Sequence, residues 1–191
     1  MKYRDSCYYH VYNRGSRKGN IFFSKENYDY FLRLVKANSN KYSTSIIACC
    51  LMPNHYHLLL FQREGGSISK TLQTTLNSYV QAVNKRYKFS GSLFQGKVKS
   101  ILVERDKYLV HLVRYIHLNP VKAKLALSPI QWEYSDYSRW VENGKPSDSL
   151  KLSDGFIGLR NSYFGGGNNY REFVEGYDYK AVGTFTKYFL E

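Results

Sequence analysis

The sequence predicts an α+β protein with a split βαβ pattern, and three observations lead to this. Short stretches of aromatic and β-branched residues alternate with two long segments of helical periodicity, in the order βαββαβ. A further helical segment follows the last strand. Hydrophobic residues make up 43% of the 191 residues, which is enough for a real core. We therefore expect a ferredoxin-like (RRM-like) antiparallel sheet with helices on one face, an additional helix and a C-terminal extension.

The first strand and helix follow from residues 7 to 40. Aromatic and β-branched side chains at 7–12 favour a strand, which ends in a basic, glycine-containing segment at 14–20. Ser24 can cap a helix, because its hydroxyl can accept a hydrogen bond from the first helical turn. Apolar residues then recur at helical spacing until the polar run at 38–40.

Two strands and a second helix come next. Residues 44–51 form an apolar, β-rich run, and a tight connection at 53–54 leads to a strand at 55–61. The first and third strands of this topology are central, so 55–61 should lie in the middle of the sheet. After the glycines at 65–66, an amphipathic helix is expected to run to about Tyr87.

The last strand is expected at 93–103 and carries Lys97 and Lys99. A helix should follow from about 106 to 119. Pro120 ends this helix or begins its exit, because proline lacks the N–H that a helix needs. We divide the chain into a domain at 1–128 and an extension at 129–191 that packs on or beside it.

Charge and cysteine content exclude several classes of protein. The chain has a net charge of +13. The positive charge is concentrated in residues 1–130, which hold 21 Lys and Arg against 6 Asp and Glu, so this part can attract a polyanion such as nucleic acid. No apolar run has the roughly 20 residues of a membrane span, and the N-terminus lacks the core of a signal peptide. The three cysteines form no Cys-x-x-Cys pair. We expect a cytoplasmic, nucleoid-associated protein of bacterial type without a membrane partner.

Two histidines on the predicted central strand form the first candidate site. The strand period of two places His55 and His57 on one face and Tyr56 on the other. Two neighbouring imidazoles can converge on one metal ion. The spacing alone favours the simpler interpretation of two polar residues on a half-exposed sheet face, because short motifs often occur by chance.

The helix that ends near Pro120 offers a second set of side chains. Tyr115 and Asn119 are four residues apart and therefore share a helix face, with Tyr108 and His111 on or near it. This face would present a phenol and a metal-ligating amide oxygen together. Tyrosines at helical spacing are also common in protein cores.

Four segments together resemble the single-tyrosine (Y1) transposases of the IS200-like and REP-associated type, within the HUH nucleases. They are YHVYNRG at 9–15, PNHYHLL at 53–59, LFQGKVKS at 93–100 and RYIHLNPVK at 114–122. The resemblance covers about two-thirds of the chain. It implies a single-strand DNA transposase that cleaves and rejoins DNA near hairpin or palindromic ends through a 5′-phosphotyrosine. It leaves a homodimer and a monomer both open.

The resemblance also implies a role for each candidate residue. Tyr115 would be the nucleophile, and His55, His57 and Asn119 would hold Mg²⁺ or Mn²⁺. His10 and His111 are candidates for lining the site, although His10 could equally be a buried, hydrogen-bonded histidine. The basic residues expected to contact DNA are Arg14, Arg17, Lys18, Lys97 and Lys99.

Two other functions remain open from the sequence. A non-catalytic nucleic-acid-binding module with an RRM-like sheet would have the same order of elements. A metal-dependent hydrolase of a small phosphoester would use water as the nucleophile. The basic surface is larger than a small substrate requires, which favours the nucleic-acid functions.

Overall fold

A four-stranded antiparallel sheet forms the centre of the computed structural model, which describes residues 2–104, 106–141 and 155–177. The strands lie in the order β2-β3-β1-β4, so the first and third strands are central, as predicted. Their bounds are Cys7–Arg14 for β1, Thr44–Met52 for β2, His55–Gln62 for β3 and Lys99–Val103 for β4. This arrangement confirms the predicted ferredoxin-like sheet.

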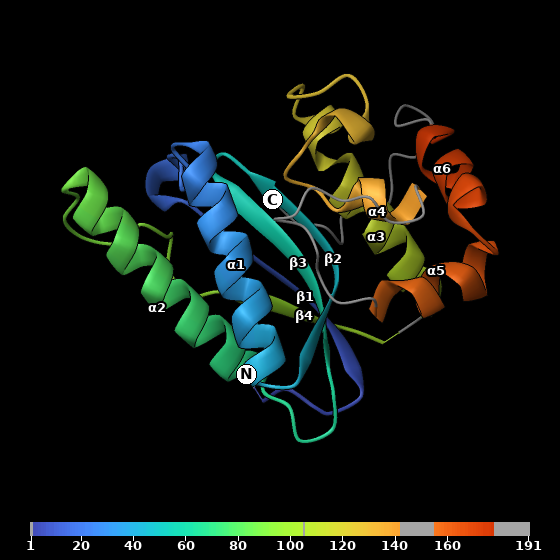
Figure 1. Cartoon of the computed structure of the whole chain (residues 1–191), viewed down its shortest axis with the longest axis horizontal. Helices are drawn as coiled ribbons and strands as arrows, with labels where there is room; N and C mark the ends of the chain where they lie inside the picture. Colours follow the sequence, from blue (N-terminus) through green and yellow to red (C-terminus); the bar gives the residue numbers. More distant parts are fainter. Residues whose placement is uncertain (1, 105, 142–154, 178–191) are drawn as a thin grey trace.

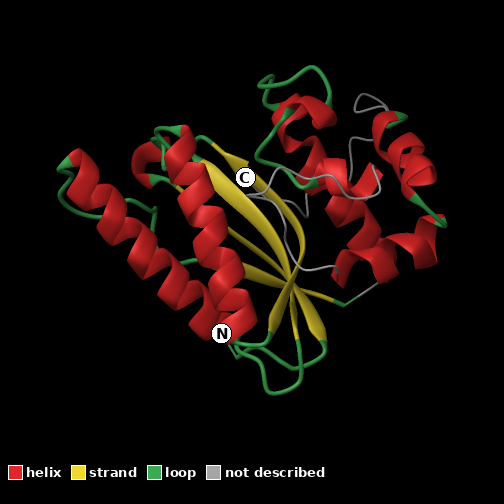
Figure 2. Ribbon diagram, in the orientation of Figure 1, coloured by secondary structure: helices red, strands yellow, loops and turns green. Residues whose placement is uncertain are grey.

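Helices cover both faces of this sheet (Figure 1). One face carries α1 (Lys25–Lys41) and α2 (Ile68–Tyr87), and the other carries α3 (Asp106–Lys122) with the helices that follow it. The view coloured by secondary structure shows the same three layers (Figure 2). Alternating residues of the strands contribute to two separate hydrophobic cores, one on each face of the sheet. Tyr56 and Leu58 pack beneath α1 and α2, whereas Leu59 packs beneath α3.

The register of the two central strands brings distant residues together. Tyr12 of β1 lies opposite His57 of β3, and Arg14 lies opposite His55. Because β1 and β3 are antiparallel, the end of β1 and the start of β3, just after the turn at 53–54, lie at the same end of the sheet. This end of the sheet carries the candidate site.

The last strand is shorter than the sequence analysis predicts. β4 begins at Lys99, whereas residues 93–98 form a loop in which Gly96 has a φ of +71°. The Gln95 amide donates to the Arg14 carbonyl, which holds this loop against the end of β1. The expectation that Lys97 and Lys99 share one strand is therefore wrong.

Helix α3 continues to Lys122, so Pro120 does not end the helix but lies in its last turn, where the chain begins to leave it. Proline removes one backbone donor, but the turn is closed by other hydrogen bonds. The Ala123 amide donates to the Asn119 carbonyl and the Leu125 amide donates to the Pro120 carbonyl, each over 2.9 Å. The helix thus extends by about one turn past the proposed metal ligand.

Described parts of the extension pack on α3 and β2. They form α4 (Tyr137–Val141), α5 (Gly155–Phe164) and α6 (Gly167–Glu175). Tyr137 and Trp140 are fully buried in the core beneath α3. The boundary between residues 128 and 129 stays a prediction, and the segments 142–154 and 178–191 lie outside the described residues. None of the described helices is long and apolar enough to span a membrane.

Candidate active site

His55 and His57 begin strand β3 and lie side by side on the face toward α3. Their ring centroids are 5.2 Å apart and the ring planes are nearly perpendicular, at 88°. His57 is buried, whereas His55 is half-buried. The period of the strand, which predicted that both rings share a face, thus places them in contact.

Asn54 fixes the tautomer of His55. The distance between the His55 Nδ1 and the Asn54 Oδ1 is 2.6 Å, and because an amide oxygen can only accept, Nδ1 carries the proton. The lone pair of His55 is therefore on Nε2. A histidine that is oriented through one ring nitrogen, so that the lone pair of the other can bind a cation, is typical of metal sites.

His10 of β1 is within hydrogen-bond distance of the His57 ring. Its Nε2 lies 2.9 Å from the His57 Nδ1, and the two rings stack with a centroid distance of 5.2 Å. Burial lowers the pKa of His10 to about 3, and burial also lowers the pKa of His57 well below its usual value. The nearby His10, His55 and Lys122 lower the pKa of His57 further. Both rings are thus neutral at pH 7, which is the form that binds metal.

This buried pair should make the protein sensitive to mild acid. Because the pKa of folded His10 lies below that of an unfolded histidine, the unfolded state binds more protons as the pH falls below 6.5, and stability is lost. From His10 alone we expect the free energy of unfolding to fall by about 1.5 kcal/mol between pH 6.5 and 5. Urea denaturation with a chelator present measures this change. The His10→Gln variant should lose that part of the pH dependence, and an unchanged slope would contradict the assignment.

Helix α3 places Tyr115 against the histidine pair. The Tyr115 ring meets the His57 ring nearly edge to face, with centroids 5.4 Å apart at 83°, and lies 6.4 Å from the His10 ring. Lys122, further along the helix, has its Nζ 5.9 Å from the centroid of the Tyr115 ring. A phenol, two neutral imidazoles and a cation therefore lie together, although they come from separate parts of the chain.

Asn119 lies one helical turn after Tyr115 and is buried. Its Nδ2 donates to the Tyr115 carbonyl over 2.8 Å, which leaves Oδ1 as the atom suited to bind a cation. Within the described residues, no group of three or more His, Cys, Asp and Glu side chains could hold a metal ion. The assignment of Asn119 as a third metal ligand stays a prediction.

A cavity of about 290 Å³ opens beside the two histidines. His55, His57, Arg14 and Lys99 line it, so four of the predicted site residues meet here. Tyr115 and Asn119 are not part of this lining, and the Tyr115 ring contacts His57 from the side of α3. The remaining lining residues are Tyr12, Asn13, Asn54 and Gln95, to which the sequence analysis gave no role. These four residues lie within three of the four segments that carry the family resemblance, and this position could have identified them from the sequence.

The other predicted residues lie around this cavity or away from it. Arg17 and Lys18 are exposed in a short 3₁₀ turn, Ser16–Lys18, and the Lys18 carbonyl accepts a hydrogen bond from Asn54 Nδ2. Lys97 lines a separate groove of about 400 Å³ between α2 and the loop at 92–98. His111 lies beside Arg114 and against Phe173 of α6, with ring centroids 5.6 Å apart.

The family of this chain follows from its similarity to known protein families. Residues 3–119 match the family described as "Transposase IS200 like", and this span includes both histidines, Tyr115 and Asn119. It is more than half of the chain. The chain belongs to the IS200-like transposase family.

Individual relatives of this IS200-like transposase agree with the family match. A Haemophilus influenzae protein named "Putative REP-associated tyrosine transposase" is 27% identical over 154 aligned positions, and the match covers 69% of this chain and 87% of that protein. A solved structure of a REP-associated tyrosine transposase bound to a REP hairpin has the same fold. Its TM-score is 0.62 at 18% identity, and the match covers 81% of this chain and 96% of that one.

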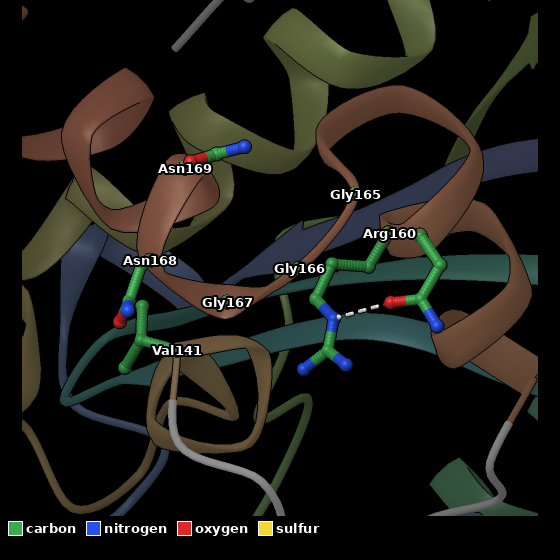
Figure 3. A pocket seen from close by; sticks show the side chains of 8 residues that line it. Val141, Arg160, Gly165, Gly166, Gly167, Asn168 and Asn169 are labelled. Carbon is green, nitrogen blue, oxygen red and sulfur yellow. Dashed lines mark hydrogen bonds between the residues drawn. The ribbon is translucent and has the colours of Figure 1, made fainter.

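A second cavity lies outside the part of the transposase that matches the family. It has a volume of about 500 Å³ and lies between α5, α6 and the end of α4 (Figure 3). Arg160 forms one wall, and its guanidinium donates to the Asn161 side chain and to the Trp140 carbonyl. The described lining of this cavity includes no predicted site residue.

Proposed function

We propose that this IS200-like transposase cleaves and rejoins single-stranded DNA beside a hairpin or palindromic end, with Tyr115 as the nucleophile. The observation that carries the proposal is the edge-to-face contact of Tyr115 with His57, over a centroid distance of 5.4 Å, beside a basic cavity. The relative solved with a REP hairpin supports DNA hairpins as the class of substrate.

The proposed reaction conserves the number of phosphodiester bonds. The Tyr115 oxygen attacks the phosphorus, the phenol loses its proton, and the bond to the 3′ oxygen breaks. The products are a 5′-phosphotyrosine and a strand with a free 3′-hydroxyl, which takes up a proton. Attack by a 3′-hydroxyl on the phosphotyrosine reverses the step, so strands can be rejoined without ATP.

Ionisation of the phenol is the main barrier that this chain has to lower. A phenol with a pKa near 10 is about one-thousandth ionised at pH 7, which corresponds to about 4 kcal/mol if the phenolate attacks. The Lys122 ammonium near the Tyr115 ring favours negative charge there. Arg14 and Lys99 line the cavity, and their charges can orient the phosphodiester.

The residues around the pair fit a divalent cation. His55, His57 and Asn119 would hold it. The two imidazole nitrogens favour Mn²⁺ over Mg²⁺, which prefers oxygen ligands such as the Asn119 amide. When bound, such a cation polarises the scissile phosphate and stabilises the leaving oxygen. If His57 binds through Nε2, its Nδ1 must donate to His10 Nε2, which makes His10 a positioning residue.

A labelled hairpin oligonucleotide tests this proposal. With Mn²⁺ or Mg²⁺, the purified protein should cut the single strand beside the hairpin. An oligonucleotide labelled at its 3′ end should then leave its label on the protein through denaturing electrophoresis, because the downstream fragment is joined to Tyr115 by its new 5′ phosphate. A chelator should prevent the adduct. Free 5′-phosphate ends without an adduct would instead indicate a hydrolase that uses water. Tight binding without any cleavage would indicate a non-catalytic RRM-like module.

A further inference from the structure

Three aromatic side chains gather on the surface at the C-terminal end of α2. Phe23, Tyr87 and Phe89 contact one another with ring centroids 4.8, 5.3 and 5.7 Å apart. Phe89 is 45% exposed and Phe23 is 38% exposed, which is unusual for phenylalanine. We call these three side chains the aromatic platform.

Hydrogen bonds hold the platform in one arrangement. The Tyr87 hydroxyl donates to the Asn27 Oδ1 over 3.0 Å, and the Phe23 amide donates to the same oxygen over 3.0 Å. The Phe89 amide donates to the Asn84 carbonyl, after a left-handed turn at Lys88 with a φ of 55°. The exposed rings are thus fixed before any partner arrives, which lowers the entropy cost of binding.

Positive charge surrounds the platform. Lys85, Arg86 and Lys88 are exposed beside it, and the Arg86 guanidinium lies 5.7 Å from the centroid of the Tyr87 ring. Glu26 is the acidic side chain paired with Arg86, over 3.9 Å and at an exposed position. Such a surface binds single-stranded nucleic acid, because bases stack on the rings and cations contact the phosphates.

The platform lies at the same end of the sheet as the histidine pair. The amides of Ile21 and Phe22 both donate to the Pro53 carbonyl, two residues before His55. The basic turn Ser16–Lys18 precedes Ile21 in the chain, and its Lys18 carbonyl accepts a hydrogen bond from the side chain of Asn54, which lines the cavity. Figure 1 shows this end of α2 at the outer edge of the helical layer.

We propose that the aromatic platform stacks an unpaired base of the single-stranded DNA that continues from the hairpin past the catalytic cavity. This inference rests on the proposed function, since it assumes the same DNA substrate. It assigns a binding role to Phe23, Tyr87 and Phe89 outside the cleavage site. Stacking accepts any base, so the platform would give affinity for a single strand without preference for its sequence.

The test compares two DNA probes under conditions that prevent cleavage. Fluorescence anisotropy with a chelator measures affinity for a blunt hairpin and for the same hairpin with single-stranded extensions on both ends. Phe89→Leu, which stays apolar but cannot stack, should weaken binding of the extended hairpin by about five- to a hundred-fold. Phe89→Trp should retain the affinity. Tyr163→Leu, at a 41% exposed aromatic residue on α5, is the matched control and should bind like the wild type.

Several outcomes would overturn the platform as a stacking site. They are unchanged binding by Phe89→Leu, equal weakening for both hairpins, and equal losses for the leucine and tryptophan variants. Thermal melting of each variant checks that it folds. If a protein partner occupies the platform instead, Phe89→Leu leaves both DNA affinities unchanged. The adduct assay at saturating DNA reports separately on the proposed function, because a failed platform would leave adduct formation intact.

Discussion

Replacing Tyr115 with phenylalanine should abolish the covalent adduct and lower strand cleavage by more than about a thousand-fold. The substitution removes only the attacking oxygen. The ring that contacts His57 over 5.4 Å remains, so we expect the fold and the affinity for a DNA hairpin to be nearly unchanged. Denaturing electrophoresis of a labelled oligonucleotide measures the adduct, and anisotropy measures binding to the same DNA.

Tyr108→Phe is the matched control for this prediction. Tyr108 lies on the same helix, two turns before Tyr115, and is also half-buried. Burial raises the pKa of the Tyr108 phenol, which makes it a poorer source of phenolate. We expect the Tyr108→Phe variant to cleave normally. An adduct formed by Tyr115→Phe but lost in Tyr108→Phe would move the nucleophile to Tyr108.

The sequence could predict the parts of the site that depend on local periodicity. A strand alternates its side chains, so His55 and His57 had to share a face once the strand was recognised. A helix repeats its faces every three to four residues, which pairs Tyr115 with Asn119. The structure places Asn119 Nδ2 on the Tyr115 carbonyl, in agreement with that spacing.

Features that depend on pairing between distant segments could not be predicted from the residues alone. The register that sets Tyr12 opposite His57 joins residues 45 positions apart, and no local pattern encodes it. The contact between His10 and His57 follows from the same register. The predicted boundaries of β4 and α3 differ from the structure for local reasons. Gly96 adopts a left-handed φ within the loop that precedes β4, and the turn around Pro120 is closed by backbone hydrogen bonds from Ala123 and Leu125.

A buried polar network behind the catalytic helix had no counterpart in the sequence analysis. His117 of α3 is fully buried, and its Nε2 lies 2.9 Å from Asp136 Oδ1. The same carboxylate oxygen accepts from the Cys49 amide of β2 over 2.7 Å. On its other side, the His117 Nδ1 lies 2.6 Å from the hydroxyl of Tyr170 on α6. Asp136 therefore connects α3 to β2, and His117 connects both to the C-terminal helices.

Asp136→Ala should be among the most destabilising single substitutions in this chain. It removes the acceptor for His117 and for the Cys49 amide, and both groups would then be buried without that partner. Breaking a buried pair in this way costs about 3–5 kcal/mol. Urea denaturation at pH 7 measures the loss. Glu133→Ala is the control, because its ion pair with Lys25 is largely exposed and should contribute less than about 1 kcal/mol.

Asp136→Asn separates the hydrogen bonds of this network from its charge. An asparagine oxygen can still accept from both the Cys49 amide and His117, so we expect a smaller loss of stability than for alanine. Burial raises the pKa of Tyr170 well above its usual value, so its hydroxyl stays protonated and able to donate to His117. If hydrogen bonding to Asp136 is what fixes α3, the folded Asp136→Asn protein should form the Tyr115 adduct at nearly the wild-type rate. An equal loss of stability in both variants would show instead that the charge of Asp136 dominates.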